Sequence, residues 1–287
     1  MTIVLCHTEL WDPHYRIPRA TWCVHANYMN NTDVVGVTML NEKIYVVFRG
    51  LEVIVVYSLG TSIFESTIHV PGLTQIMSLT SCSVTNCLYF SFADLTPVEN
   101  VRIWRVTLKG TVIKWKGTSG GQLSASRGHV VAVDNSVLSV YSSEGYQLKE
   151  LYNDKVVLFS AVETASDKFV AVCKQHTVQG NAAMVVVLDS GGNIIRSCQE
   201  QLFPVGEILS LPTFLEVTLD DAGRVFVADW VSQRVLLLGS DLEFIRVLLT
   251  AEEEWDDINV PRHLNFNAQT GELLTLTWTN RLNVYKV

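Results

Sequence analysis

The chain has 287 residues, of which 48% are hydrophobic and 17% charged, and this composition excludes a globally disordered protein. Its net charge of −8 disfavours nucleic-acid binding, because lysine and arginine supply most of the affinity for phosphates. No apolar run approaches the roughly 18–20 residues of a membrane-spanning helix, and the first residues lack the basic start and apolar core of a secretory signal.

The six cysteines are too sparse for a scaffold built on disulfides, and none forms a C-x-x-C motif. We therefore expect reduced, mostly buried thiols, with Cys82 and Cys87 spaced to face each other across a hairpin. Together with the missing signal, this predicts a cytoplasmic protein without membrane contact. Whether the chain is part of a longer protein is left open.

The N-terminal region divides into two parts. Residues 2–9 are strand-like. Residues 10–32 contain two prolines and several aromatic residues and lack the pattern seen later in the chain, so we expect an irregular segment there. A long segment with its own aromatic residues either packs across the body or contributes to a binding surface.

One module then recurs along the rest of the chain. It consists of a tight turn such as Asn41-Glu42, an apolar strand, a second apolar strand and, in most cases, a further turn and strand. The first apolar strands recur about every 40–55 residues, and they span residues 43–49, 87–92, 129–134, 168–173, 224–229 and 272–278.

Modules of this length made only of strands are typical of β-propeller blades. Six modules predict an all-β fold, a six-bladed β-propeller formed by one domain over residues 1–287. The last module has only three strands before the chain ends at Val287. We therefore expect the N-terminal strand, residues 2–9, to complete that blade and close the ring, which removes a free sheet edge.

The fifth module resembles an NHL repeat. It has an Asp-x-x-Gly turn at residues 220–223, a strand that ends in Ala228-Asp229, a short loop, and Arg234 before another apolar strand. Residues 214–250 match this pattern well and residues 261–287 fairly. The resemblance implies a six-bladed propeller used mostly for binding, of RNA in some members and of proteins in others, with lyases and hydrolases as distant relatives.

Two features of the sequence could belong to a catalytic or metal site, but neither has the surrounding residues that such a site requires. Residues 117–121 match G-x-S-x-G, but a nucleophile elbow requires a helix after the serine, and residues 122–126 look like a strand that opens a blade. The seven histidines form no closely spaced pair suited to zinc. We expect no catalytic residues, no metal and no cofactor, although we leave the question of enzymatic activity open.

Candidate binding residues gather on one face of the predicted propeller. The loops between second and third strands and the connections between blades share this face, and it has longer loops, such as residues 175–182, than the short turns opposite, which we expect to be too short to make a pocket. Its mixed charges and tryptophans suit a peptide or a small polar ligand better than phosphates. The candidate residues are Arg49, Asp134, His176, Asp229, Trp230, Arg262, Trp278 and Arg281.

Asp229 and Arg234 match the Asp…Arg pair of the NHL family, and we interpret them as a clasp that organises the loop between them. For the whole chain we expect a monomeric, non-catalytic scaffold that recognises a protein or peptide through the loop-rich face. The alternatives are a lactonase-like hydrolase with a divalent metal at the channel mouth, and RNA binding of the NHL type. Analysis of the purified protein for bound metal would distinguish the hydrolase from the scaffold. A measurement of salt-dependent RNA binding would distinguish the RNA-binding protein from the scaffold.

Overall fold

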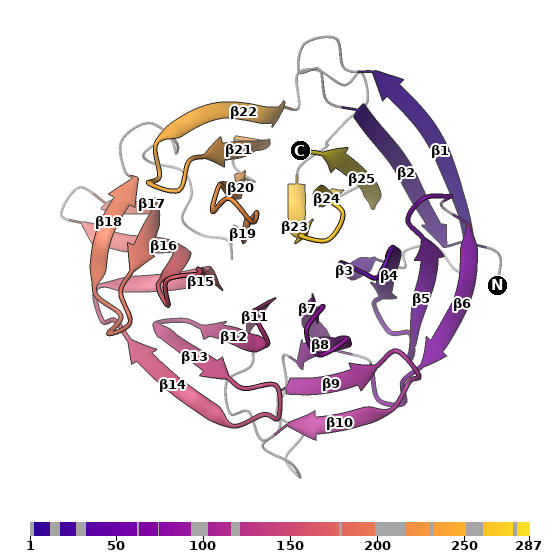
Figure 1. The fold of residues 1–287 in the computed structure, drawn as a ribbon, viewed down its shortest axis with the longest axis horizontal. Coiled ribbons are helices and arrows are strands. Elements are labelled where there is room, and N and C mark those ends of the chain that lie inside the picture. The colour runs from indigo at the N-terminus through magenta and orange to yellow at the C-terminus, as the bar shows by residue number, and fades with distance from the viewer. Residues whose placement is uncertain are drawn as a thin grey trace.

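The computed structural model describes residues 3–11, 18–26, 33–61, 63–73, 75–92, 103–115, 121–177, 180–198, 216–229, 232–250, 261–277 and 280–287. These residues form six antiparallel sheets that surround a central axis as the blades of a propeller (Figure 1). No helix occurs among them. The predicted all-β, six-bladed propeller is therefore confirmed.

Each blade is a meander that runs from the axis outward. The innermost strands are β3 (Val34–Leu40), β7 (Ile76–Cys82), β11 (Gln122–Ser126), β15 (Val156–Glu163), β19 (Glu216–Leu219) and β23 (Pro261–Asn267). The second strands are β4 (Lys43–Phe48), β8 (Cys87–Phe92), β12 (His129–Asp134), β16 (Phe169–Thr177), β20 (Val225–Asp229) and β24 (Glu272–Thr277).

The third strands are β5 (Val53–Ser58), β9 (Ile103–Thr107), β13 (Val137–Tyr141), β17 (Gly180–Leu188), β21 (Arg234–Leu238) and β25 (Arg281–Lys286). The outer strands of the first five blades are β6 (Phe64–His69), β10 (Val112–Trp115), β14 (Gln147–Tyr152), β18 (Ile194–Cys198) and β22 (Phe244–Thr250). In the sixth blade this place belongs to β2 (Pro18–Ala26), with β1 (Ile3–Trp11) outside it.

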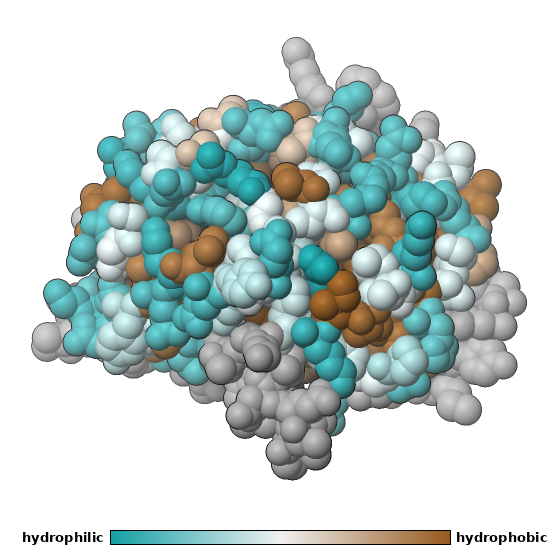
Figure 2. Space-filling model, turned by 60° about the horizontal axis from the view of Figure 1, so that its bottom comes forward, coloured by the Kyte–Doolittle hydropathy of each residue, from teal (hydrophilic) through white to brown (hydrophobic). Residues whose placement is uncertain are grey.

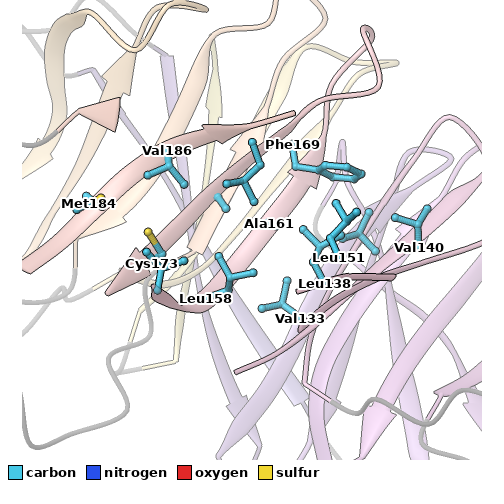
Figure 3. Close-up of a cluster of buried hydrophobic side chains, with 14 residues drawn as sticks. Val133, Leu138, Val140, Leu151, Leu158, Ala161, Phe169, Cys173, Met184 and Val186 are labelled. Carbon is cyan, nitrogen blue, oxygen red and sulfur yellow. The ribbon is translucent and has the colours of Figure 1, made fainter. Parts of the chain in front are cut away.

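The burial of the strands follows their sequences. The second strands are almost continuously apolar because both of their faces pack against neighbouring blades, and β8 is buried at every position. The outer strands carry polar residues, and most of β6 is exposed. The core consists of six hydrophobic clusters, one between each pair of neighbouring blades. Figure 3 shows the one between the third and fourth blades, where Phe169 and Leu158 face Leu138 and Leu151.

The tight turns lie where the sequence predicts them. Asn41 and Glu42 both have positive φ angles, 51° and 57°, as do Arg127 and Gly128, at 53° and 84°. Two consecutive residues with positive φ form the hairpin turn whose twist matches that of the strands. These turns join the first and second strands of their blades, and we call the face that carries them the turn face.

The ring closes through the N-terminal region, as expected, but with a different strand. It is β2 that pairs with β25, with Trp22 opposite Leu282, and β1 pairs only with the outer edge of β2. The predictions that residues 2–9 complete the blade and that residues 10–32 are irregular are therefore wrong. Pro18 is compatible with this strand because it is its first residue, and the free edge of β25 stabilises an extended conformation that residues 18–26 show only weakly in their sequence.

The connection between β16 and β17 differs from the prediction, whereas the segment that leads into β11 agrees with it. Residues 175–182 were expected to be a long loop, but β16 and β17 form one hairpin in which Lys174 pairs with Ala183 and Thr177 with Gly180. The strand predicted after the G-x-S-x-G motif is confirmed as β11. The last glycine of that motif, Gly121, has a φ of 142°, and a Cβ atom there would lie 1.9 Å from the Val133 carbonyl oxygen. The fold itself therefore requires this glycine.

The described cysteines Cys82, Cys87, Cys173 and Cys198 are free thiols. Cys82 and Cys87 lie opposite each other in the β7–β8 hairpin, as their spacing predicts. Burial raises the pKa of Cys173 to about 12 and also raises the pKa of Cys87 and Cys198. Because the thiolate is the reactive form, Cys173 is an inert core residue.

Candidate functional site in the axial channel

The innermost strands leave one edge facing the channel, where backbone groups lack a neighbouring strand and need other partners. In each of the six gaps between neighbouring inner strands, one side chain bridges to the backbone. The bridges are Ser81 Oγ to Met39 O (2.7 Å), Leu123 N to Ser78 Oγ (3.0 Å), Ser124 Oγ to Ala161 O (2.6 Å), Val217 N to Ser160 Oγ (3.3 Å), Leu264 N to Glu216 Oε2 (2.6 Å) and Met39 N to Asn265 Oδ1 (3.2 Å).

Five of these bridges use neutral serine or asparagine, and the sixth uses the carboxylate of Glu216. This residue begins β19 and is 6% exposed. Its Oε1 atom contacts Nδ1 of His263 at 2.7 Å and accepts a hydrogen bond from Nε2 of Gln122. Gln122 belongs to the third blade and Glu216 to the fifth, so this hydrogen bond passes in front of the fourth blade and crosses part of the channel.

The carboxylate fixes the tautomer of His263. An ionised carboxylate only accepts hydrogen bonds, so Nδ1 of His263 must carry the proton that faces Glu216. In the neutral imidazole, Nε2 then has a free lone pair. Among the described residues Nε2 has no hydrogen-bond partner, and it is not one of the fully enclosed polar atoms. In that neutral form His263 offers an acceptor to the channel, although the residue is only 8% exposed.

The channel contains a cavity of about 770 Å³ that is lined mainly by the inner strands and also extends outward between the fourth and fifth blades, to Val187 and Arg196. Gln122, Glu216 and His263 line its interior, and the cavity extends to the turn face, where Arg127, Ser166 and the turn at 221–223 border it. The expectation that these short turns cannot frame a pocket is therefore wrong. They are short, but the ring places all six around one axis, and together they form a rim (Figure 1).

A second carboxylate, Glu163 at the end of β15, also lines the cavity. Its Oε2 atom contacts Nδ1 of His129 at 2.9 Å, and its side chain is 5% exposed. Three cationic side chains line the outer part of the cavity. Arg127 and Arg196 are about half exposed and pair with Asp167 and Asp241 respectively, and Lys168 is exposed. The buried carboxylates of the cavity thus contrast with exposed cations at its edge.

Among the candidate residues whose side chains the structure describes, namely Arg49, Asp134, Asp229, Arg262 and Arg281, none lines this cavity. Asp229 is fully buried and accepts hydrogen bonds from Arg234 Nε at 2.9 Å and from the backbone of Ser232 at 3.1 Å. Both carboxylate oxygens are therefore engaged, which agrees with the interpretation of the Asp…Arg pair as a loop clasp.

Two of the predicted residues do come together at the loop-rich end of the channel. Arg49 Nε lies 3.6 Å from Asp33 Oδ2, and Arg262 is near enough to feel the charges of Asp33, Arg49 and Glu216. Arg262 is 6% exposed, and the loss of hydration on burial is the main cause that lowers its pKa. The guanidinium of Arg262 thus offsets part of the Glu216 charge from the loop-rich side.

Two other predicted residues, Asp134 and Arg281, make local hydrogen bonds. Asp134 accepts a hydrogen bond from its neighbour Asn135 at 2.9 Å, and the backbone of Arg281 donates to Thr277 at 3.2 Å. His176 lies near the end of β16, but its side chain is outside the described part of the structure. Trp230 and Trp278 lie outside the described residues, so their role as binding residues stays a prediction.

Two other kinds of feature are absent from the described residues. No three His, Cys, Asp or Glu side chains within them are grouped so that they could hold a metal ion. No helix among them is long and apolar enough to span a membrane. On the side of the molecule shown in Figure 2, hydrophobic residues form small separate patches on a mostly hydrophilic surface.

Solved structures confirm the fold at low sequence identity. The WD40 repeats of RRP9 are 12% identical, with a TM-score of 0.62 over 99% of this chain and 97% of that chain. Streptogramin B lyase is 10% identical, with a TM-score of 0.57 over 99% and 97%, and the WD40 propeller domain of Doa1 is 14% identical, with a TM-score of 0.57 over 89% and 93%. No model of a known protein family matches the chain, and no curated protein matches it. The NHL family is therefore not confirmed.

Proposed function

We propose that this propeller is a non-catalytic binding protein whose partner is a polypeptide seated over the turn-face mouth of the channel. The observation that carries this proposal is the cavity of about 770 Å³, which reaches the turn face and is bordered there by short turns such as those at Arg127 and residues 221–223. Rigid strands that hold variable turns around a concave site are a common arrangement for recognition. The mixed rim charges and the absence of close metal-ligand groups among the described residues favour a peptide over a phosphate-bearing ligand.

The resemblance to WD40 propellers supports this proposal only through the shared fold, because one fold hosts many functions. The loop-rich face, which carries Trp230 and Arg281, is the competing docking surface. The two faces can be tested separately, since no described side chain among the candidates of the loop-rich face lines the cavity.

The experiment compares two double variants in a pull-down from a cell lysate, followed by binding measurements with the purified partner. Lys168→Ala with Asp221→Ala removes two exposed charged side chains that border the cavity, and Trp230→Ala with Arg281→Ala alters the loop-rich face. We expect the first pair to weaken binding at least tenfold and the second to leave it unchanged. The reverse pattern would place the partner on the loop-rich face and overturn the proposal.

One observation favours a second candidate function. His263 has one ring nitrogen held by a buried carboxylate and the other free, which is how enzymes orient a histidine that acts as a general base. The candidate reaction class is hydrolysis or elimination on a small polar substrate inside the cavity. A panel of lactone and ester substrates would test it, and turnover that His263→Asn abolishes would favour this candidate over a binding role.

A further inference from the structure

We infer that the polypeptide partner inserts one aromatic side chain between the fourth and fifth blades, where the channel cavity extends outward on the turn face. This inference rests on the proposed function and adds the chemical identity of the group that enters the cavity. The six gaps between neighbouring blades are filled in different ways, and that difference identifies the group.

The gap between the fourth and fifth blades contains no buried ring. Each of the other five buried clusters includes at least one aromatic residue, such as Phe169 between the third and fourth blades and Phe226 between the fifth and sixth. The twelve buried residues of the fourth–fifth cluster are all valine, leucine or alanine. Among the described residues, only the partly buried Phe159 brings a ring to this cluster, and it lies in the half of β15 that is farther from the turn face.

The cavity enters this gap along one row of side chains on the fourth blade. Strand pairing places Val162, Val170, Val187 and Arg196 opposite one another across the four strands of the blade. Directly paired residues project from the same face of a sheet, and the three valines belong to the cluster that faces the fifth blade. All four residues line the cavity, and Leu219 of the fifth blade lines it from the other side. We call this extension of the cavity the valine slot.

The preceding gap shows what such a row packs against. On the third blade, Val131, Val140 and Lys149 are paired in the same way as the outer three residues of the row on the fourth blade. Phe169 of the fourth blade packs against them and is 1% exposed (Figure 3). The Nζ atom of Lys149 lies 5.9 Å from the centre of its ring. None of these four residues lines the cavity, so the ring of Phe169 closes this gap.

The fifth blade has a valine at the position of Phe169. Phe169 begins β16 and Val225 begins β20, and each pairs with the last residue of the strand before it, Glu163 and Leu219 respectively. Because valine is much smaller than phenylalanine, the row on the fourth blade stays partly uncovered and the cavity reaches it. Leu242, in the turn between β21 and β22, packs into the same cluster but does not close the slot.

The groups around the slot favour an aromatic side chain over an aliphatic one. The valine walls suit any apolar group, but Arg196 stands at the outer end, where the third blade has Lys149. Arg196 forms an ion pair with Asp241 and donates a hydrogen bond to the Asp241 carbonyl oxygen at 3.1 Å, which fixes its guanidinium beside the slot. A guanidinium is attracted to the negative face of an aromatic ring and can stack on it. An entering ring would thus meet the same kinds of groups that surround Phe169.

The test begins with the selection of peptides. Random dodecapeptides displayed on phage are selected against the full chain, and the affinity of the enriched peptides is measured by calorimetry. We expect one fixed phenylalanine, tyrosine or tryptophan in the enriched set, and its replacement with alanine should weaken binding at least tenfold. Replacement with cyclohexylalanine, which keeps the size but loses the aromatic face, should weaken binding about two- to fivefold, as expected for one cation–π contact.

Two variants locate the ring. Val225→Phe gives the fifth blade the ring that Phe169 provides in the fourth, so it should fill the slot and weaken the aromatic peptide at least tenfold. Val187→Thr keeps the shape of the row but adds a hydroxyl to it, and it should weaken that peptide at least threefold. Both should leave the affinity of the alanine-substituted peptide nearly unchanged. Thermal melts identify a variant that fails to fold, and the other variant then decides.

The matched control is Val140→Thr. It makes the same change at the same position of the row on the third blade, which Phe169 covers and the cavity does not reach. It should leave the affinity of both peptides unchanged. If it weakened the aromatic peptide as much as Val187→Thr does, the loss would reflect general damage to the propeller and the inference would fail.

The outcomes separate the two proposals. Enriched peptides without a fixed aromatic residue, or with one whose affinity ignores both slot variants, would overturn this inference and leave the peptide-binding function standing. A selection that enriches no peptide would overturn the proposed function and this inference with it. N-acetylphenylalanine amide, a single blocked aromatic residue, is the third probe, and binding as tight as that of the peptide would contradict a polypeptide partner.

Discussion

The gap between β19 and β23 differs from the other five gaps around the channel. Ser78, Ser124 and Ser160 bridge their neighbours with a neutral hydroxyl, whereas Glu216 does the same with a buried carboxylate. The serines show that a neutral side chain satisfies the backbone of an inner strand. The charge of Glu216 is therefore not required for ring closure, and its contacts with His263 and Gln122 indicate a role inside the channel.

The largest effect that tests this comparison is expected from Glu216→Ala. The change leaves the backbone N–H of Leu264 and Nδ1 of His263 buried without an acceptor, and each unsatisfied group costs about 1–3 kcal/mol. We expect a loss of about 3–5 kcal/mol in the free energy of unfolding, in the range seen when one member of a buried charged pair is removed. Chemical denaturation measures it, and a loss below 1 kcal/mol would mean that the ring does not depend on this bridge.

Glu216→Gln separates the bridge from its charge. Glutamine keeps one oxygen for the backbone of Leu264, but it loses the charge-assisted contact with His263. We expect a loss of about 1–3 kcal/mol in the same denaturation experiment, the usual value of a hydrogen bond to a charged group. A variant more stable than the wild type would sharpen the comparison further, because it would show that the carboxylate is retained at the expense of stability.

Ser160→Ala provides the neutral counterpart. It removes the acceptor for the backbone N–H of Val217 in the neighbouring gap, and we expect a loss of about 1 kcal/mol. The exposed change Glu150→Gln is the control and should stay within about 0.5 kcal/mol. If Ser160→Ala destabilised the protein as much as Glu216→Ala, the two kinds of bridge would be equivalent and the comparison would fail.

The smallest expected effect concerns thiol reactivity. Burial raises the pKa of Cys173 to about 12, so at pH 8 almost none of this thiol is ionised, and Ellman's reagent should modify Cys198, which is partly exposed, well before Cys173. Cys173 packs between the third and fourth blades, in a cluster that does not include Glu216. In Glu216→Ala it should stay protected if the damage is local, and rapid labelling in that variant would indicate that the whole ring loosens.

The blades could be predicted from sequence because their signal is local and repeated. The alternation of strands such as β4 and the turn residues Asn41 and Glu42 act within a few positions, so the pattern alone locates them. Strand β2 was missed because residues 18–26 owe their conformation to β25, more than 250 residues along the chain. The local strand propensity of a segment carries no information about such a distant partner.

The candidate site was missed for a related reason. Glu216 lies 47 residues from His263 and 94 from Gln122, and only the ring brings the three together. One signal was nevertheless present: a charged residue inside an apolar segment that must become an innermost strand is an expected buried charge. Residues that follow strand ends, such as Asp229, look like better binding candidates in the sequence, but in the structure Asp229 holds a loop together with Arg234.

The most direct test of the central claim is a crystal structure of the protein with a selected peptide bound. The account predicts that the peptide covers the turn-face mouth of the channel and contacts residues that border it, such as Arg127 and the turn at 221–223. A peptide seated on the loop-rich face would contradict it.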